Sequence, residues 1–229
     1  MRVTDTNWMW LAEYLTRDDR AVVPLGSIEE HCYLSLGTDM ILAERVAVEA
    51  AELLGIPVFP AVAYGITPYF RAFPGSLGLR VSTYVAVVRD LLDCLLAQGF
   101  KRIVLVNGHG GNSPAISLAA EWMADNPAGR VVVHNWWNAP RTWEAVQAID
   151  PDASHGSWME NFPWNRVAAS PAGKKPMVDM SRLRWLPPAG VRDLIGDGSY
   201  GGAYEKPDDQ MLHLWQVAVA ETREIIDAV

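Results

Sequence analysis

The sequence predicts an α/β fold, a three-layer α/β/α sandwich built around a mainly parallel sheet. Short apolar segments alternate with segments of helical periodicity through the first two thirds of the chain. Such alternation is typical of a parallel sheet covered on both faces. Half of the 229 residues are hydrophobic, enough for one core, so we expect a single domain over residues 1–229.

The first elements follow from periodicity. Apolar residues at helical spacing predict a helix within 5–16, and the apolar run 20–25 predicts a buried strand. Residues 38–54 are rich in Ala, Leu and Glu, and Gly55 is a plausible end for this helix. A second strand is expected over 58–63.

The middle of the chain begins with a long loop, because 64–80 is dense in Gly, Pro and aromatic residues without periodicity. A helix over 82–98 and a strand over 101–106 follow. This strand lacks polar alternation, which implies burial on both faces. A helix over 113–125 and another buried strand over 130–134 complete the alternation.

The pattern weakens beyond Pro140. Residues 154–164, SHGSWMENFPW, could begin a helix, and 170–200 is loop-rich. A C-terminal helix over 208–228 is expected from its amphipathic pattern.

Composition excludes several classes of function. A formal net charge of −8 argues against binding nucleic acid or an anionic membrane. The N-terminus lacks the plan of a signal peptide, and no window approaches the ~20 apolar residues of a membrane span, so we expect a soluble cytoplasmic protein. Cys32 and Cys94 form no CxxC pattern, and Cys94 is expected in the core. Most of the ten tryptophans should lie in the core or a subunit interface.

The segment 22–39, VVPLGSIEEHCYLSLGTD, is a candidate metal site because an apolar run ends in Glu29, His31 and Asp39. On a strand, Glu29 and His31 would share a face about 6.6 Å apart and could hold different metals, with Glu30 facing elsewhere. Two metals that share a water typically lie about 3.5–4 Å apart, and the carboxylate of Asp39 could bridge them. The alternative is an ordinary helix start, with Thr38 as N-cap and Asp39 in the first turn.

The glycine-rich sequence 107–112, NGHGGN, follows the predicted strand 101–106. It would bring His109 to the same sheet edge as His31, because carboxyl ends of parallel strands meet there. The alternative is a phosphate cradle of backbone N–H groups, but the spacing misses GxGxxG and no GK[ST] follows. Metal ligation is the favoured interpretation.

His155 and Glu160 are the remaining candidates for chemistry. They could supply a proton shuttle and one more carboxylate ligand if their loop folds over the crevice. The alternative is a loop histidine and a solvated acid. His134 and His213 are expected to be structural.

These motifs together resemble the creatininase (creatinine amidohydrolase) family. The likeness rests on Gly26–His31 with Gly37–Asp39, on Asn107–Asn112 and on His155–Glu160. Weaker likenesses are FPGS at 73–76 and GDGS at 196–199 with Glu205-Lys206. The likeness covers nearly the whole chain.

The resemblance implies an α/β/α fold, hydrolysis of a small-molecule substrate, two divalent metal ions (Zn, Mn or Fe) and a homo-oligomer, commonly a hexamer. It implies that Glu29 and His109 bind one metal, that His31 and Glu160 bind the other, and that Asp39 bridges them. By the same resemblance His155 protonates a leaving nitrogen, so that His155 and Glu160 are the catalytic candidates. Substrate-binding candidates are Ser76, Trp136, Trp137 and Arg71.

Three departures argue against creatinine as the substrate. The family segment HGPHLPLxTD is replaced by HCYLSLGTD, which is one residue shorter and lacks the second histidine and the proline. Phe70 stands near where the family often has a histidine. Gly111 replaces the glutamate of creatininase proper, so Glu160 must provide that carboxylate.

The sequence thus predicts a binuclear metal-dependent hydrolase, in which a metal-bridging hydroxide attacks an amide or cyclic amide. Deformylation, peptide cleavage or opening of a keto-sugar ring are alternatives within the family. A non-catalytic module that binds an anion or another small molecule is the alternative from a different class.

Overall fold

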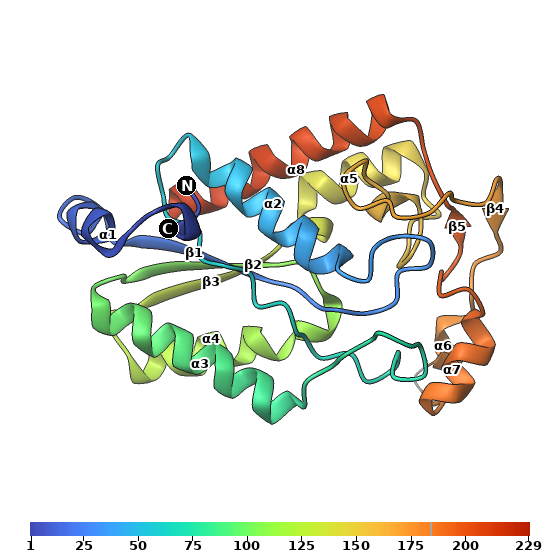
Figure 1. Ribbon diagram of the computed structural model, residues 1–229, viewed down its shortest axis with the longest axis horizontal. Coiled ribbons are helices and arrows are strands. Elements are labelled where there is room, and N and C mark those ends of the chain that lie inside the picture. The colour runs from blue at the N-terminus through green and yellow to red at the C-terminus, as the bar shows by residue number, and fades with distance from the viewer. Residues whose placement is uncertain (184) are drawn as a thin grey trace.

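A parallel three-stranded sheet lies at the centre of the protein (Figure 1). The computed structural model describes residues 1–183 and 185–229. Strands β1 (Arg20–Leu25), β2 (Arg102–Asn107) and β3 (Arg130–Asn135) lie in the order β1-β2-β3. They are paired residue for residue, so their carboxyl ends reach the same edge of the sheet. The strands predicted over 20–25, 101–106 and 130–134 are confirmed within one residue.

Helices cover both faces of this sheet (Figure 1). One layer contains α2 (Thr38–Glu52), α5 (Pro140–Ile149) and α8 (Asp208–Ala228), and the other contains α3 (Val81–Gln98) and α4 (Pro114–Asp125). Successive residues of a strand point to opposite faces, and β1 shows this. Val22 joins the apolar cluster beneath α2 and α8, whereas Val23 joins the cluster beneath α3 and α4. The predicted three-layer α/β/α sandwich is confirmed.

The strand expected over 58–63 is reduced to two isolated bridges. Val58 pairs with Val22 and Val62 pairs with Leu25, both in parallel. Val58 and Val62 are four residues apart, whereas their partners Val22 and Leu25 are three residues apart. The extra residue in the 58–62 segment interrupts the ladder of backbone hydrogen bonds. Pro60 lies in this interruption and has no N–H to donate.

Shorter elements occupy the ends of the chain. The N-terminus forms η1 (Val3–Asp5) and α1 (Trp8–Tyr14). The expected loop-rich region 170–200 includes two short helices, α6 (Met180–Leu183) and α7 (Pro188–Ile195). Strands β4 (Lys174–Lys175) and β5 (Gly202–Ala203) pair antiparallel. The helix suggested over 154–164 is a single 3₁₀ turn, η4 (Trp158–Glu160).

Two expectations about burial were wrong. Cys94 is exposed on α3 instead of lying in the core. Strand β3 is an edge strand with only Val131 and His134 buried, so it is not covered like β2. Among the tryptophans, Trp122, Trp136, Trp158 and Trp215 are buried in the core, whereas Trp8 and Trp185 are 75% and 81% exposed. Within residues 1–183 and 185–229, no helix is long and apolar enough to cross a membrane.

Candidate metal centre and active site

A cleft of about 640 Å³ opens beyond the carboxyl ends of β1 and β2, where the sequence predicted a site. Its floor carries carboxylates and histidines, and its walls are largely apolar. The acidic and histidine side chains that line it are Glu29, Asp39, His109, His155 and Glu160. His31 lies fully buried behind them and is 1% exposed.

The five predicted metal ligands form two groups that share Asp39. In one group, His109 Nδ1 lies 2.9 Å from Asp39 Oδ2 and 3.2 Å from Glu29 Oε1. In the other, His31 Nε2 lies 3.0 Å from Asp39 Oδ1 and 3.8 Å from Glu160 Oε2. Each oxygen of Asp39 therefore faces a different histidine.

The second nitrogen of each histidine is held by a backbone carbonyl. His31 Nδ1 lies 3.2 Å from the carbonyl oxygen of Glu29, and His109 Nε2 lies 2.9 Å from that of Ile66. A carbonyl only accepts hydrogen bonds, so both of these nitrogens carry a proton. The opposite nitrogens, which face the carboxylates, need either a second proton or a metal ion between the two groups.

Buried polar atoms support a metal at this place. Glu29 Oε2, His31 Nε2 and Asp39 Oδ2 are buried and make no well-aligned hydrogen bond among the described residues. Atoms of this kind are costly unless something satisfies them. Histidine nitrogens with carboxylate oxygens are a donor set that zinc and manganese accept. The residues present therefore fit a pair of divalent cations.

The charges in the cluster shift its pKa values. Burial would lower the pKa of His31 and His109, but the carboxylates beside them raise both pKa values well above the usual range. Burial would raise the pKa of Asp39, but the two histidines hold it far below its ordinary value. Burial raises the pKa of Glu160 despite the nearby His31. Without a cation, protons on the histidines balance the carboxylates.

The turn after β2 is held by its two asparagines. Asn107 donates to the carbonyl of His109 at 2.8 Å, and Asn112 donates to the carbonyl of Gly26 at 3.0 Å, which ties this turn to the one after β1. A Cβ at Gly108 would lie 2.6 Å from the backbone oxygen of Asp39, so glycine allows close approach to α2. The carboxylates facing this turn make it a poor phosphate cradle.

The segment after β1 differs from expectation. The strand ends at Leu25, so Glu29 and His31 lie in a loop and not on one face of a strand. Cys32 adopts a left-handed conformation with φ of 58°, at the position where the family segment has glycine. The expectation that Glu30 faces away from the site was wrong, because Glu30 is 5% exposed and contacts His155.

The start of α2 also differs from the alternative interpretation. Gly37, not Thr38, is the N-cap of the helix. The hydroxyl of Thr38 donates to the carbonyl of Ser35 at 2.7 Å. Asp39 does lie in the first turn, but it is 4% exposed and faces the two histidines. Asp39 is therefore not an ordinary solvent-exposed acid in the first turn of a helix.

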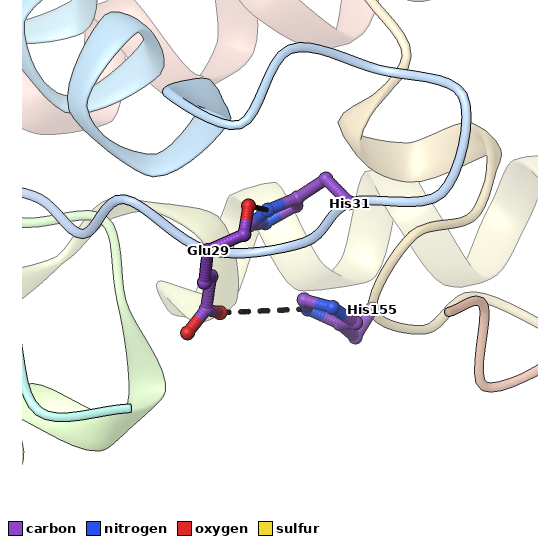
Figure 2. A group of neighbouring side chains, drawn as sticks. All are labelled: Glu29, His31 and His155. Carbon is purple, nitrogen blue, oxygen red and sulfur yellow. Dashed lines mark hydrogen bonds and ion pairs between the residues drawn. The ribbon is translucent and has the colours of Figure 1, made fainter. Parts of the chain in front are cut away.

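The loop that carries His155 and Glu160 folds over the cleft. The backbone N–H of Gly156 donates to Glu160 Oε2 at 2.7 Å and orients that carboxylate. His155 points toward Glu29, with Nδ1 3.9 Å from Glu29 Oε1 (Figure 2). Its ring stacks on Phe70 with centroids 4.8 Å apart. The hydrogen bond with Glu30 raises the pKa of His155 although burial and His31 lower it.

The four substrate-binding candidates do not lie together. Trp137 lines the cleft, whereas Trp136 is 4% exposed and packs in the core against Trp215. Ser76 accepts the backbone N–H of Glu30 at 2.9 Å, and Arg71 is exposed outside the cleft lining.

Sequence reasoning missed several residues of the cleft wall. Tyr69, Trp143 and Tyr200 all line it. Tyr200 directly follows the GDGS segment, which was the one sequence signal that could have pointed to it. His134 lies 3.0 Å from the hydroxyl of Thr222, beneath α8, in agreement with the structural role expected for it.

Comparison with known proteins places the chain in a family. The model of the family Creatininase: Creatinine amidohydrolase matches residues 4–226. Creatinine amidohydrolase of Pseudomonas putida is 28% identical over 180 residues, which cover 73% of this chain and 69% of that protein. Mycofactocin precursor peptide peptidase of Mycolicibacterium smegmatis is 35% identical over 105 residues, 43% of this chain and 42% of that protein.

Solved structures agree with the fold. A crystal structure of creatinine amidohydrolase (creatininase) has a TM-score of 0.81 at 21% identity, covering 99% of this chain and 96% of that one. Two further creatininase structures, named as a manganese form and as a Zn-Zn type, have TM-scores of 0.78 and 0.77 at 22% and 23% identity. Each covers 99% of this chain and 97% of its own. The chain therefore belongs to the creatininase family and is an enzyme of that family.

Proposed function

We propose that this enzyme hydrolyses an amide or cyclic amide C–N bond at a centre of two divalent metal ions, and that creatinine is not its substrate. The observation that carries the proposal is the double role of Asp39. Its two oxygens face His31 and His109 at 3.0 and 2.9 Å, and each histidine has a further carboxylate of its own. This arrangement suits one bridging aspartate between two ions.

The ligand sets follow from the two groups. Glu29 and His109 would hold one ion, His31 and Glu160 the other, and Asp39 both. Three carboxylates offset most of the charge of two divalent ions, so burial of the cluster is not prohibitive. When bound, such ions lower the pKa of water and polarise a substrate carbonyl. Zinc, manganese or iron would suit these ligands.

His155 is placed to move the proton. It lies in the cleft wall beside Glu29, and its ring centroid is 4.4 Å from that of His31. A histidine at this place can accept a proton from the attacking water and give it to the leaving nitrogen. The C–O bond forms as His155 accepts the proton, and the C–N bond breaks as His155 returns that proton to the nitrogen, which gives a carboxylic acid and a neutral amine.

The walls of the cleft favour an uncharged substrate with an apolar group. Pro68, Tyr69, Phe70, Trp137 and Trp143 line it, and the described lining contains no lysine or arginine. An acidic substrate would find no lysine or arginine among these described residues as a counter-charge. Phe70 and the shortened segment before Asp39 support a substrate other than creatinine.

Peptide cleavage is the second candidate. Mycofactocin precursor peptide peptidases share 35% identity with parts of this chain. Tyr69 and Trp143 are 43% and 37% exposed at the cleft, where they could contact a longer chain. The expected homo-oligomer and cytoplasmic location stay predictions.

Metal analysis with a substrate panel tests the proposal. Purified protein should contain about two equivalents of transition metal per chain, as the two ligand groups require. It should hydrolyse at least one of a cyclic amide, a neutral dipeptide or an aromatic amide faster than creatinine, and a chelator should abolish this activity. Fully folded, metal-free protein that binds a small molecule without turnover would overturn the proposal in favour of a binding module.

A further inference from the structure

Glu30 is a buried acid that the proposed metal centre does not use. Glu30 lies between two metal-ligand candidates in sequence, but its carboxylate contacts His155, and Glu30 belongs to none of the candidate metal groups among the described residues. Glu30 Oε1 is 3.0 Å from His155 Nε2, and the backbone oxygen of Glu30 lies at the same distance from that nitrogen. Two acceptors of one residue therefore converge on a single histidine nitrogen.

This contact fixes the tautomer of His155. An ionised carboxylate and a carbonyl can only accept, so the neutral ring must carry its proton on Nε2. The lone pair then lies on Nδ1, the nitrogen that faces Glu29 at 3.9 Å across the cleft (Figure 2). The ring packs against both Phe70 and Tyr200, with centroids 4.8 and 4.9 Å away, which opposes a ring flip.

The carboxylate of Glu30 is itself held from several sides. The backbone N–H of Glu30 donates to Ser76 Oγ at 2.9 Å, and the side-chain oxygen Oε2 of Glu30 accepts the backbone N–H of Cys32 at 3.3 Å. A Cβ at Gly198, where φ is 105°, would lie 1.7 Å from Glu30 Oε2. The glycine therefore lets the 196–199 segment cover the acid at van der Waals contact.

A carboxylate suits this place better than an amide. Its two oxygens face two donors, the ring N–H of His155 and the backbone N–H of Cys32. Glutamine would have to point its NH₂ group at one of these donors, whichever way its amide is turned. Two donors would then face each other without an acceptor, which costs stability or changes the tautomer or orientation of the His155 ring.

We propose that Glu30 is the positioning residue of His155 and that Nδ1, not Nε2, is the atom that transfers the proton. The proposal rests on the amide hydrolysis proposed above. Nδ1 takes a proton from the attacking water as the C–O bond forms, and it returns that proton to the nitrogen of the breaking C–N bond. Glu30 holds the Nε2 proton throughout and stabilises the imidazolium between the two transfers.

The test compares Glu30→Gln with Glu221→Gln. Glu221 is another buried glutamate that accepts hydrogen bonds, from Thr142 beneath α8, so its variant controls for general destabilisation. Long-range ¹H–¹⁵N spectra of the purified holoprotein at alkaline pH report the tautomer of each histidine, and His155→Asn assigns the signals of His155. The same preparations give metal content, kcat and KM on the panel substrate.

We expect the wild type to show His155 protonated at Nε2 with a slowly exchanging proton. Glu30→Gln should shift or broaden that signal and lower kcat about 10- to 100-fold, as for other residues that orient a functional histidine. Its KM and metal content should stay unchanged, and Glu221→Gln should change neither the signal nor kcat.

Protonation of His155 at Nδ1 in the wild type would overturn the proposal. An unchanged kcat in Glu30→Gln would do the same, as would a fall in kcat explained by lost metal. Failure of the proposed function looks different. A protein that turns over no substrate can still show the Nε2 tautomer and its dependence on Glu30, and the positioning of His155 would then stand without the hydrolytic role.

Discussion

The site has two halves that are held in different ways. The sheet half comprises Glu29, His31, Asp39 and His109, which follow β1, start α2 or follow β2. The loop half comprises His155, Glu160 and Tyr200, and a single 3₁₀ turn is the main regular element near the first two. Parallel strands and a helix fix the first half, whereas side-chain and backbone hydrogen bonds fix the second.

Those hydrogen bonds join the loop half to itself and to the sheet half. Ser154 Oγ donates to the carbonyl of Gly201 at 2.6 Å, which brings Tyr200 beside His155. Asn165 donates to the carbonyl of Glu160 at 2.8 Å and to the hydroxyl of Thr38 at 3.1 Å. Glu160 is the one proposed metal ligand of the loop half. On this arrangement, we expect the sheet half to form most of the metal centre and metal binding through Glu160 to tie the loop half to it.

Asp39→Ala should have the largest effect, because both proposed ions lose a ligand at once. We expect metal content to fall from about two equivalents to below about one, and turnover to fall to background. Metal analysis of protein that keeps its circular dichroism spectrum checks this. Asp90→Ala, at an exposed acid on α3, is the matched control. Full metal content in Asp39→Ala would show that the sheet half is not a metal centre.

His155→Ala should distinguish the contribution of the loop half to turnover from the contribution of the sheet half to metal binding. Turnover should fall about 10²- to 10⁴-fold, the usual range for a positioned acid–base group, while metal content stays at the wild-type level. His31→Ala should instead lose metal. Parallel kinetics and metal analysis of both variants measure the contrast. If His155→Ala lost as much metal as His31→Ala, His155 would belong to the metal ligands.

Asn165→Ala should loosen the link between the halves. The substitution removes buried hydrogen bonds, so unfolding free energy should fall by about 1–3 kcal/mol and Tm by several degrees. Metal affinity should fall by about tenfold because Glu160 loses its support. Thermal melts at several zinc concentrations measure both. Asn126→Ala is the control, since Asn126 donates to the carbonyl of Trp122 at the end of α4, away from the site.

The pH dependence of stability should have opposite sign with and without metal. The pKa values of His31 and His109 are raised in the metal-free fold. Their stabilisation is therefore complete below the unfolded pKa of about 6.5 and is lost as pH rises through the higher folded pKa. The lowered pKa of Asp39 acts only at acid pH, below its ordinary 3.8.

We thus expect Tm in chelator to fall by a few degrees between about pH 6 and pH 9. With zinc present, Tm should rise over the same interval, because metal must displace protons from these histidines. Differential scanning fluorimetry in matched buffers measures both curves. Parallel curves would mean that the protons and the metal do not compete for one site.

Much of the sheet half could be predicted from the sequence. Uninterrupted apolar runs identified β1 and β2, and parallel strands bring their carboxyl ends together, so the polar residues after them had to meet. Helix α5 was missed because the pattern weakens beyond Pro140, although proline is favoured in the first turn of a helix.

The loop half was less predictable because long-range hydrogen bonds set it. The two-residue alternation of a strand placed Glu30 away from the site, but β1 ends at Leu25 and Cys32 turns left-handed. Because residues 26–31 form a loop, the alternation of a strand does not apply to Glu30, and the turn at Cys32 brings its N–H to Glu30 Oε2. Neither feature follows from local propensity. Nothing local in the sequence indicates that Tyr200 packs against His155.

A crystal structure of the zinc-loaded protein with anomalous diffraction at the zinc edge tests the central claim most directly. Two anomalous peaks should appear about 3.5–4 Å apart, the spacing of ions that share a bridging carboxylate. One should lie among Glu29, Asp39 and His109, and the other among His31, Asp39 and Glu160. A single peak, or two peaks that do not share Asp39, would contradict the account of a binuclear centre.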